Sequence, residues 1–131
     1  MVIDSHVLYW WLEGHPGLSP KALQVIAAAE NGTSPLLIAP VSFWELSRKE
    51  GLGSFRPRRP VREWPGILDK ADWIEMVPTT TQIWLLSAEL NWAHKDPADR
   101  IIAATALLRG VPVLTKDRLF HQSDCPVEAV W

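Results

Sequence analysis

Residues 94–117 read HKDPADRIIAATALLRGVPVLTKD, and in this stretch a helix signal runs directly into a strand signal. Asp96 followed by a proline is the order expected of a helix N-cap and a first helical residue. The apolar positions of Arg100–Arg109 continue the helix, and Gly110 ends it. Val111–Leu114 is a short apolar run, which predicts a buried strand.

The rest of the chain repeats this alternation of short apolar runs and helical patterns. Further strands are predicted at Val2–Ile3, Leu36–Ala39, Trp73–Val77 and Val127–Val130. Helices are predicted over residues 5–12, 20–30, 42–49, 61–71 and 81–90, with Ser5 and Ser19 as candidate caps of the first two. Such alternation favours an α/β fold of three layers, α/β/α, whose central sheet is mostly parallel and has four to five strands.

Composition narrows the class of protein. A chain of 131 residues, 47% hydrophobic and 21% charged, is expected to fold as one globular domain. Its formal net charge of −2 excludes a polycation that coats nucleic acid, but it allows an acidic site beside a basic rim. Cys125 is the only cysteine, which excludes an internal disulfide and a thiolate zinc cluster. The start of the chain has no signal-peptide pattern, so a cytoplasmic location is expected.

Four acidic residues lie where the predicted strands end or the following helices begin. Asp4 follows the first strand, Asp117 follows Leu114 closely, and Glu45 and Asp99 lie in the first turns of helices. Because ligands of an open parallel sheet collect at the carboxyl ends of its strands, these side chains are expected to converge. A divalent cation makes such a group of like charges tolerable, and oxygen ligands suit Mg²⁺ or Mn²⁺. Such a metal can activate water for attack on a phosphodiester.

Each acid also has a simpler structural interpretation, and the spacing alone leaves both open. Asp96 is explained as an N-cap, and Asp99 as the acid three residues later that interacts with the same helix terminus. Asp4 suits a cap of the first helix, and Asp117 suits a turn. Glu45 is harder to explain without a site, because it lies among apolar neighbours where a partly buried carboxylate needs a partner.

Four segments, read together, resemble the motifs of a known family. They are residues 2–10 (VIDSHVLYW), 40–46 (PVSFWEL), 94–106 (HKDPADRIIAATA) and 113–120 (VLTKDRLF). In this order they are similar to the motifs of PIN-domain ribonucleases of the VapC toxin type.

The resemblance implies a single PIN domain over residues 1–131 and a Mg²⁺- or Mn²⁺-dependent endoribonuclease, the toxin of a type II toxin–antitoxin system. It assigns the catalytic and metal-binding roles to Asp4, Glu45, Asp99 and Asp117. Candidates for supporting roles around these acids are Ser5, Asp96, Thr115 and Arg118. The implied partners are RNA, a VapB-like antitoxin and a second copy of the chain.

Three other sets of residues have more than one interpretation. The basic group Arg56, Arg58, Arg59 and Arg62 is either a solvated loop or a contact surface for RNA phosphates. Trp10, Trp11 and Trp44 are either core residues or anchors for a helical partner. The four histidines, His6, His15, His94 and His121, are scattered and are interpreted as surface or packing residues.

Two rival functions deserve a test. A phosphoacceptor signalling domain also has an acidic Mg²⁺ pocket, but it normally has paired acids after its first strand, where this chain has Asp4 alone. A PIN-like domain without catalysis, which only binds a partner, is the second rival; the presence of all four acids argues against it.

Overall fold

The structure is a computed structural model that describes all residues 1–131, and it is built on one sheet of five parallel strands. The strands are β1 (Val2–Ile3), β2 (Leu36–Ile38), β3 (Ile74–Met76), β4 (Val113–Leu114) and β5 (Ala129–Val130). Their order across the sheet is β3-β2-β1-β4-β5, and every neighbouring pair is parallel. The predicted parallel sheet is confirmed, with five strands.

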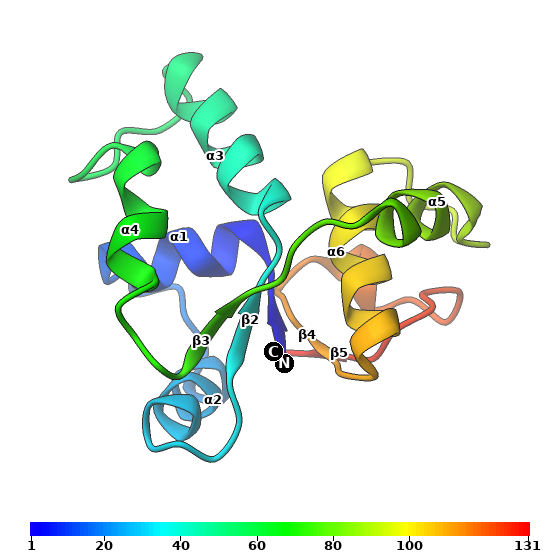
Figure 1. Cartoon of the computed structure of the whole chain (residues 1–131), viewed down its shortest axis with the longest axis horizontal. Helices are drawn as coiled ribbons and strands as arrows, with labels where there is room; N and C mark the ends of the chain where they lie inside the picture. The colour runs from blue at the N-terminus through cyan, green and yellow to red at the C-terminus, as the bar shows by residue number, and fades with distance from the viewer.

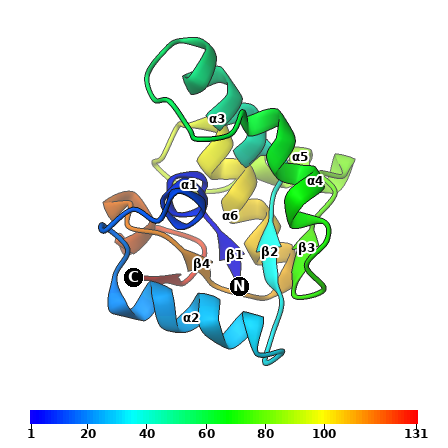
Figure 2. The same cartoon turned by 90° about the vertical axis from the view of Figure 1, so that its left-hand side faces the viewer.

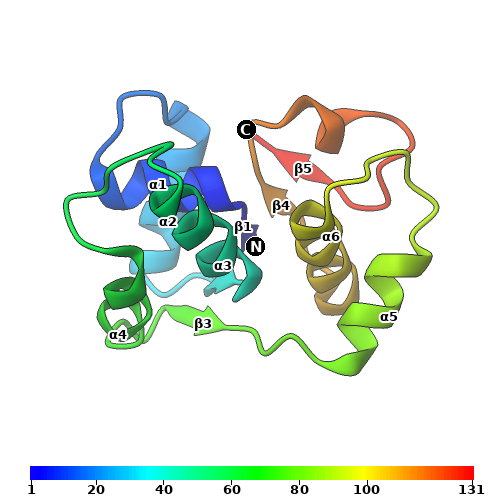
Figure 3. The same ribbon diagram turned by 90° about the horizontal axis from the view of Figure 1, so that it is seen from above.

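Helices cover both faces of this sheet. They are α1 (Ser5–Glu13), α2 (Pro20–Glu30), α3 (Val41–Gly51), α4 (Trp64–Leu68), α5 (Thr81–Glu89) and α6 (Pro97–Arg109), with the 3₁₀ helices η1 (Val61–Glu63) and η2 (Arg118–His121). Figures 1 and 3 show α1, α2 and α4 on one side of the sheet and α5 and α6 on the other. The three-layer α/β/α architecture is therefore confirmed. No helix is both long and apolar enough to span a membrane.

The two faces of the sheet have separate cores because side chains alternate along each strand. Val2 lies beside Val113 in the strand register, and both are buried in the core shared with α6. Ile3 lies beside Leu114, and both are buried in the core on the side of α1 and α2. Figure 2 shows β4, β1 and β2 side by side, with α1 in front of them and α6 behind.

The carboxyl ends of β1 and β4 lie next to each other at one edge of the sheet. The amide of Asp4 donates to the carbonyl of Leu114 over 3.1 Å, which continues the pairing one residue past the strands. α1 begins at this edge, and α3 rises from it in Figure 1, in contact with both α1 and α6. The edge is thus the meeting point of elements that are far apart in the sequence.

Two local predictions need correction. The helix predicted over residues 61–71 is only the short pair η1 and α4, ending at Leu68. Pro65 has no amide hydrogen for the carbonyl of Val61, but it lies in the first turn of α4, where the missing donor is tolerated, and η1 runs directly into α4. Ser5 is the first residue of α1 and not its cap; the N-cap is Asp4.

Candidate metal centre

Asp4 is a buried carboxylate at the end of the central strand. It is 2% exposed, and its Oδ2 accepts a hydrogen bond of 2.5 Å from the Thr115 hydroxyl. The His6 Nδ1 atom lies 2.9 Å from the same oxygen. Since both neighbours contact Oδ2, and no hydrogen bond or ion pair engages Oδ1, the second oxygen remains available as a ligand.

Thr115 orients two of the acids at once. Its hydroxyl donates to Asp4 and accepts the amide of Asp117 over 3.0 Å. The Asp117 carboxylate in turn accepts the amide of Leu119 and begins η2. The supporting role expected of Thr115 therefore has a direct structural basis.

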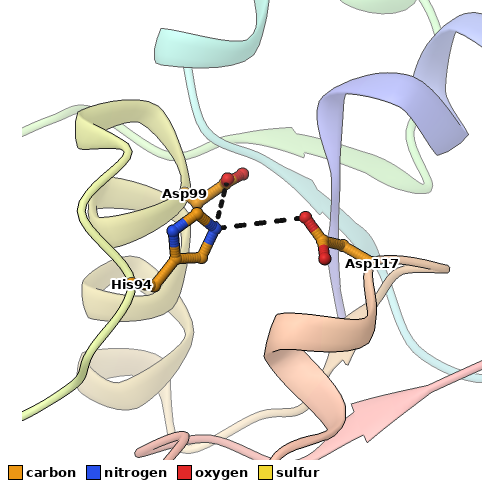
Figure 4. Close-up of side chains that lie close together, drawn as sticks. All are labelled: His94, Asp99 and Asp117. Carbon is orange, nitrogen blue, oxygen red and sulfur yellow. Dashed lines mark ion pairs between the residues drawn. The ribbon is translucent and has the colours of Figure 1, made fainter.

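Asp99 lies in the first turn of α6 and faces Asp117 across the site. His94 lies between them, with its Nε2 atom 2.7 Å from Asp99 Oδ2 and 4.0 Å from Asp117 Oδ2 (Figure 4). One ligand atom from each of the three residues lies within 4.8 Å of the others, which is close enough for a shared metal ion.

Glu45 approaches from the first turns of α3. Its Oε1 atom lies 2.5 Å from the ammonium of Lys49, one helical turn later. Its charge also acts on Asp99 and on His6, so Glu45 belongs to the same electrostatic group. Lys49 is thus the cationic partner of Glu45.

The charges in this group perturb one another strongly. Burial, and then the carboxylates of Asp4, Asp96, Glu45 and Asp117, raise the pKa of Asp99 to about 8. Burial of the His6 ring disfavours its charged form, but the hydrogen bond and charge of Asp4, together with Asp117 and Glu45, prevail and raise its pKa. A carboxyl group that keeps its proton at neutral pH marks a site with too little positive charge.

The residues present fit a divalent cation. The carboxylates of Asp99 and Asp117 offer oxygen ligands close to each other, and hard cations prefer such ligands. Asp4 and Glu45 are not part of this close group, but their charges act on Asp99. The hydroxyls of Ser5 and Ser42, at the starts of α1 and α3, are buried and have no hydrogen-bond partner. Such groups are suited to bind water around a hydrated ion.

The other supporting candidates have different outcomes. Asp96 is the N-cap of α6 and accepts the amides of Ala98 and Asp99, so its cap interpretation is correct. No ion pair joins Arg118 to Asp117. Ser5 follows Asp4 in the sequence and is buried. The supporting role of its hydroxyl remains a prediction.

The basic group is separate from the acids. Arg58 donates to the carbonyl of Glu13 and pairs with its carboxylate, at the C-terminal end of α1. Asp4 is at the other end of this helix of nine residues, which is about 13 Å long. The basic loop therefore flanks the acidic edge at a distance and does not enter it.

Two histidines are the residues that the sequence interpretation missed. His6 contacts Asp4, and the His94 side chain, 9% exposed, contacts Asp99. Both rings also pack against aromatic side chains, as the packing interpretation expects, but their contacts with the acids are not part of that interpretation. His94 lies only two residues before the N-cap Asp96, but nothing in the sequence reveals that Trp92 and Phe120 hold its ring against the acids.

The three tryptophans differ from one another. Trp44 is 57% exposed, so it is not a core residue. Trp11 is partly buried in the core on the side of α1 and packs edge-on against Trp73. Trp10 stacks on His15, and Lys116 lies 5.1 Å above its ring.

Comparison with known proteins gives the class. The PIN domain family matches residues 1–124, and the chain belongs to this family. Within it, the chain is similar along its whole length to Ribonuclease VapC22 of Mycobacterium tuberculosis (strain ATCC 25618 / H37Rv). The two are 33% identical over 134 residues, covering 100% of this chain and 98% of the relative. The resemblance inferred from the four motifs is confirmed.

Solved structures support the same fold. VapBC2 from Rickettsia felis, bound to a DNA fragment from its promoter, matches with a TM-score of 0.66 at 13% identity, over 98% of this chain and 96% of the other. A toxin–antitoxin complex from Klebsiella pneumoniae matches with a TM-score of 0.65 at 17% identity, over 99% and 95% of the two chains. At these identities the likeness concerns the fold alone.

Proposed function

We propose that the chain is a metal-dependent endoribonuclease, the toxin of a type II toxin–antitoxin pair. The observation that carries the proposal is geometric: Asp4 is buried and oriented by Thr115, and one ligand atom each of His94, Asp99 and Asp117 lies within 4.8 Å of the others. Burial, and then the neighbouring carboxylates, raise the pKa of Asp99 to about 8, which supports it. Family membership and the similarity to a protein named as a ribonuclease support the choice of RNA as substrate. One PIN domain over residues 1–131 and a cytoplasmic location are parts of the same proposal.

In this proposal Asp4 and Asp99 bind a Mg²⁺ or Mn²⁺ ion directly. Each has one carboxylate oxygen held by neighbours, Oδ2 in both cases, and the other free to face the ion. Glu45 and Asp117 complete the site, directly or through water. When bound, the ion supplies Lewis-acid chemistry, since it lowers the pKa of water and stabilises charge on a phosphoryl oxygen.

The chain's own residues then orient the reaction. Thr115 fixes Asp4 and Asp117 relative to each other, and Lys49 balances the charge of Glu45, which would be free to face the ion if that contact opened. Water attacks the RNA phosphorus, and the bond to the 3′ oxygen breaks. The products are a 5′-phosphate and a 3′-hydroxyl end.

The test is cleavage of tRNA and ribosomal RNA by the purified protein, with Mg²⁺ or Mn²⁺ and with a chelator. Cleavage should require the metal, and Asp4→Ala should abolish it. Asp72→Ala, an exposed acid before β3, is the matched control and should cut normally. Cutting by Asp4→Ala at the normal rate would exclude this mechanism. A wild-type protein that binds a partner but cuts no RNA would favour the non-catalytic PIN-like rival.

The basic loop is proposed to contact RNA phosphates beside the acidic edge. All four arginines are exposed, and Arg58 alone is paired, with Glu13. Substituting Arg56, Arg59 and Arg62 with glutamine should weaken RNA binding. Each lost phosphate contact should lower the slope of log K against log salt by about 0.7 for single strands. An unchanged slope would show that these arginines make no contact with RNA phosphates.

Protein partners are the last part of the proposal. The solved relatives include toxin–antitoxin complexes, which supports a VapB-like antitoxin for this chain. We also expect a homodimer, by analogy with the family. Light scattering during gel filtration of the pure chain, and of the chain co-expressed with the neighbouring open reading frame, tests both expectations.

A further inference from the structure

We propose that His94 is a positioning residue, which donates a hydrogen bond from Nε2 to the carboxylate of Asp99 and does not itself bind the metal. The inference rests on the proposed function, because it concerns the same metal site. It adds a residue that the four-acid pattern does not contain.

The His94 ring is rigidly held. Its side chain is 9% exposed and packs edge-on against Trp92 at 4.7 Å and against Phe120 at 6.3 Å between ring centroids. The Nε2 atom is completely buried. A ring packed in this way cannot turn out to solvent without leaving an apolar pocket.

The loop that carries His94 is held by Arg100, the first residue after Asp99. Its guanidinium donates to the His94 carbonyl over 2.9 Å and to the Trp92 carbonyl over 3.0 Å. It also donates to the carbonyls of Ser87, Ala88 and Leu90 at the end of α5. One side chain of α6 thus fixes the loop, so the distance between His94 and Asp99 is set by the fold.

The hydrogen bond to the other ring nitrogen decides the tautomer. The amide of Asp96 donates to His94 Nδ1 over 3.3 Å, so Nδ1 carries no proton and a neutral ring carries its proton on Nε2. Histidines that bind metal usually show the opposite arrangement, in which the second nitrogen donates to a carbonyl or carboxylate. The hydrogen bond from the Asp96 amide to Nδ1 therefore favours an Nε2 atom that carries a proton and donates it, rather than one that binds a metal.

The protonated nitrogen faces the acids. Nε2 lies 2.7 Å from Asp99 Oδ2, although the angle is outside the range of a regular hydrogen bond, and 4.0 Å from Asp117 Oδ2. In the proposed arrangement the Asp99 carboxylate rotates so that Oδ2 accepts the hydrogen of Nε2. Asp99 would then accept the hydrogen bond of His94 at Oδ2 and keep Oδ1 for the ion. Figure 4 shows the His94 ring between the carboxylates of Asp99 and Asp117.

Two substitutions separate positioning from packing. His94→Leu keeps an apolar side chain and removes the donor, whereas His94→Gln places an amide donor near the position of Nε2. We expect His94→Leu to weaken Mn²⁺ binding about 10- to 100-fold, the usual loss when a partner of a metal ligand is removed. His94→Gln should restore most of the affinity. His15→Leu, an exposed histidine away from the acids, is the matched control and should bind as the wild type does.

The measurement is a titration with Mn²⁺ alone, followed by electron paramagnetic resonance and calorimetry, with thermal melting to confirm that each variant folds. Equal Mn²⁺ affinity in His94→Leu and wild type would overturn the proposal, while a wild-type protein that binds no Mn²⁺ would instead refute the proposed function. Spin-echo modulation of bound Mn²⁺ should show no directly coordinated nitrogen; a nitrogen coupling that vanishes in His94→Gln would make His94 a ligand. Should His94→Leu fail to fold, the ¹⁵N shifts of the wild-type ring decide, since protonation of Nδ1 contradicts the proposal.

Discussion

Asp4 and Asp96 occupy the same position in two different helices and have opposite roles. Both are N-cap residues with extended backbone, at φ −72°, ψ 153° and φ −65°, ψ 122°. The Asp96 carboxylate accepts two amides of its own helix, those of Ala98 and Asp99. The Asp4 carboxylate accepts none from α1 and contacts Thr115 and His6 instead.

The difference comes from what precedes each helix. Asp4 follows the central strand, so Thr115 at the end of the neighbouring strand β4 is within reach of its side chain. Asp96 follows the loop from α5, where no strand end competes with the amides of the helix. An N-cap carboxylate therefore need not bind the amides of its own helix when a side chain at a neighbouring strand end, such as Thr115, donates a hydrogen bond to it.

The largest expected effect contrasts these two aspartates. Asp4→Asn should lower the cleavage rate by about 10³-fold or more, because it removes a charged ligand of the ion without changing the shape of the side chain. Asp96→Asn should lower it by less than about threefold, since asparagine is as good an N-cap as aspartate. Single-turnover cleavage of one RNA by both variants is the measurement. Equal losses would mean that both N-caps serve the metal site.

Arg100 gives the second largest effect and concerns the loop that leads into α6. Its guanidinium donates to five backbone carbonyls. We expect Arg100→Ala to lower the free energy of unfolding by about 2–4 kcal/mol, because these carbonyls lose a charged donor. Denaturant unfolding measures this loss, with Arg62→Ala, an exposed arginine, as the control. If Arg100→Ala loses no more free energy of unfolding than Arg62→Ala, the hydrogen bonds of Arg100 do not stabilise the loop.

The smallest expected effect is the change in stability at Asp99, and its sign is opposite to that of a normal ion pair. Its pKa rises from 3.8 to about 8 in the metal-free protein, so the folded state holds a proton that the unfolded state has released between these values. Stability of the metal-free protein should therefore fall as pH rises from about 4 to 8. Asp99→Asn should remove this slope and raise stability at pH 7 by about 1–3 kcal/mol, while it abolishes cleavage. Thermal melts of the wild type and the variant across this pH range, with chelator present, are the measurement. An Asp99→Asn variant that is less stable than the wild type at pH 7 would contradict the prediction.

Most of the fold could be predicted from local sequence. The helix after Asp96 was predictable from Pro97 at its start and Gly110 at its end, and the strand β4 from the apolar run before Thr115. The alternation of strands and helices predicted the parallel sheet. The early end of α4 at Leu68 and the 3₁₀ geometry of residues 61–63 are not visible in the apolar pattern.

The site was predictable only in part. Acids at strand ends pointed to one edge of the sheet, and Asp4 and Asp117 do follow the neighbouring strands β1 and β4 there. Caps and ligands look alike in sequence, however, as Asp4 and Asp96 show. The contact between His94 and Asp99 depends on Phe120, which packs against the His94 ring, and on Arg100, which donates to the His94 carbonyl. These tertiary contacts cannot be predicted from the spacing of residues in the sequence.

Crystals of the wild-type protein soaked in Mn²⁺ would test the central claim most directly, since anomalous scattering locates the ion. We expect one strong peak within coordinating distance of both Asp4 Oδ1 and Asp99, with His94 Nε2 outside that distance. The Lys49 ammonium should have moved away from Glu45. A peak that lies elsewhere, or no peak between Asp4 and Asp99 at saturating Mn²⁺, would contradict the claim that these carboxylates share a cation.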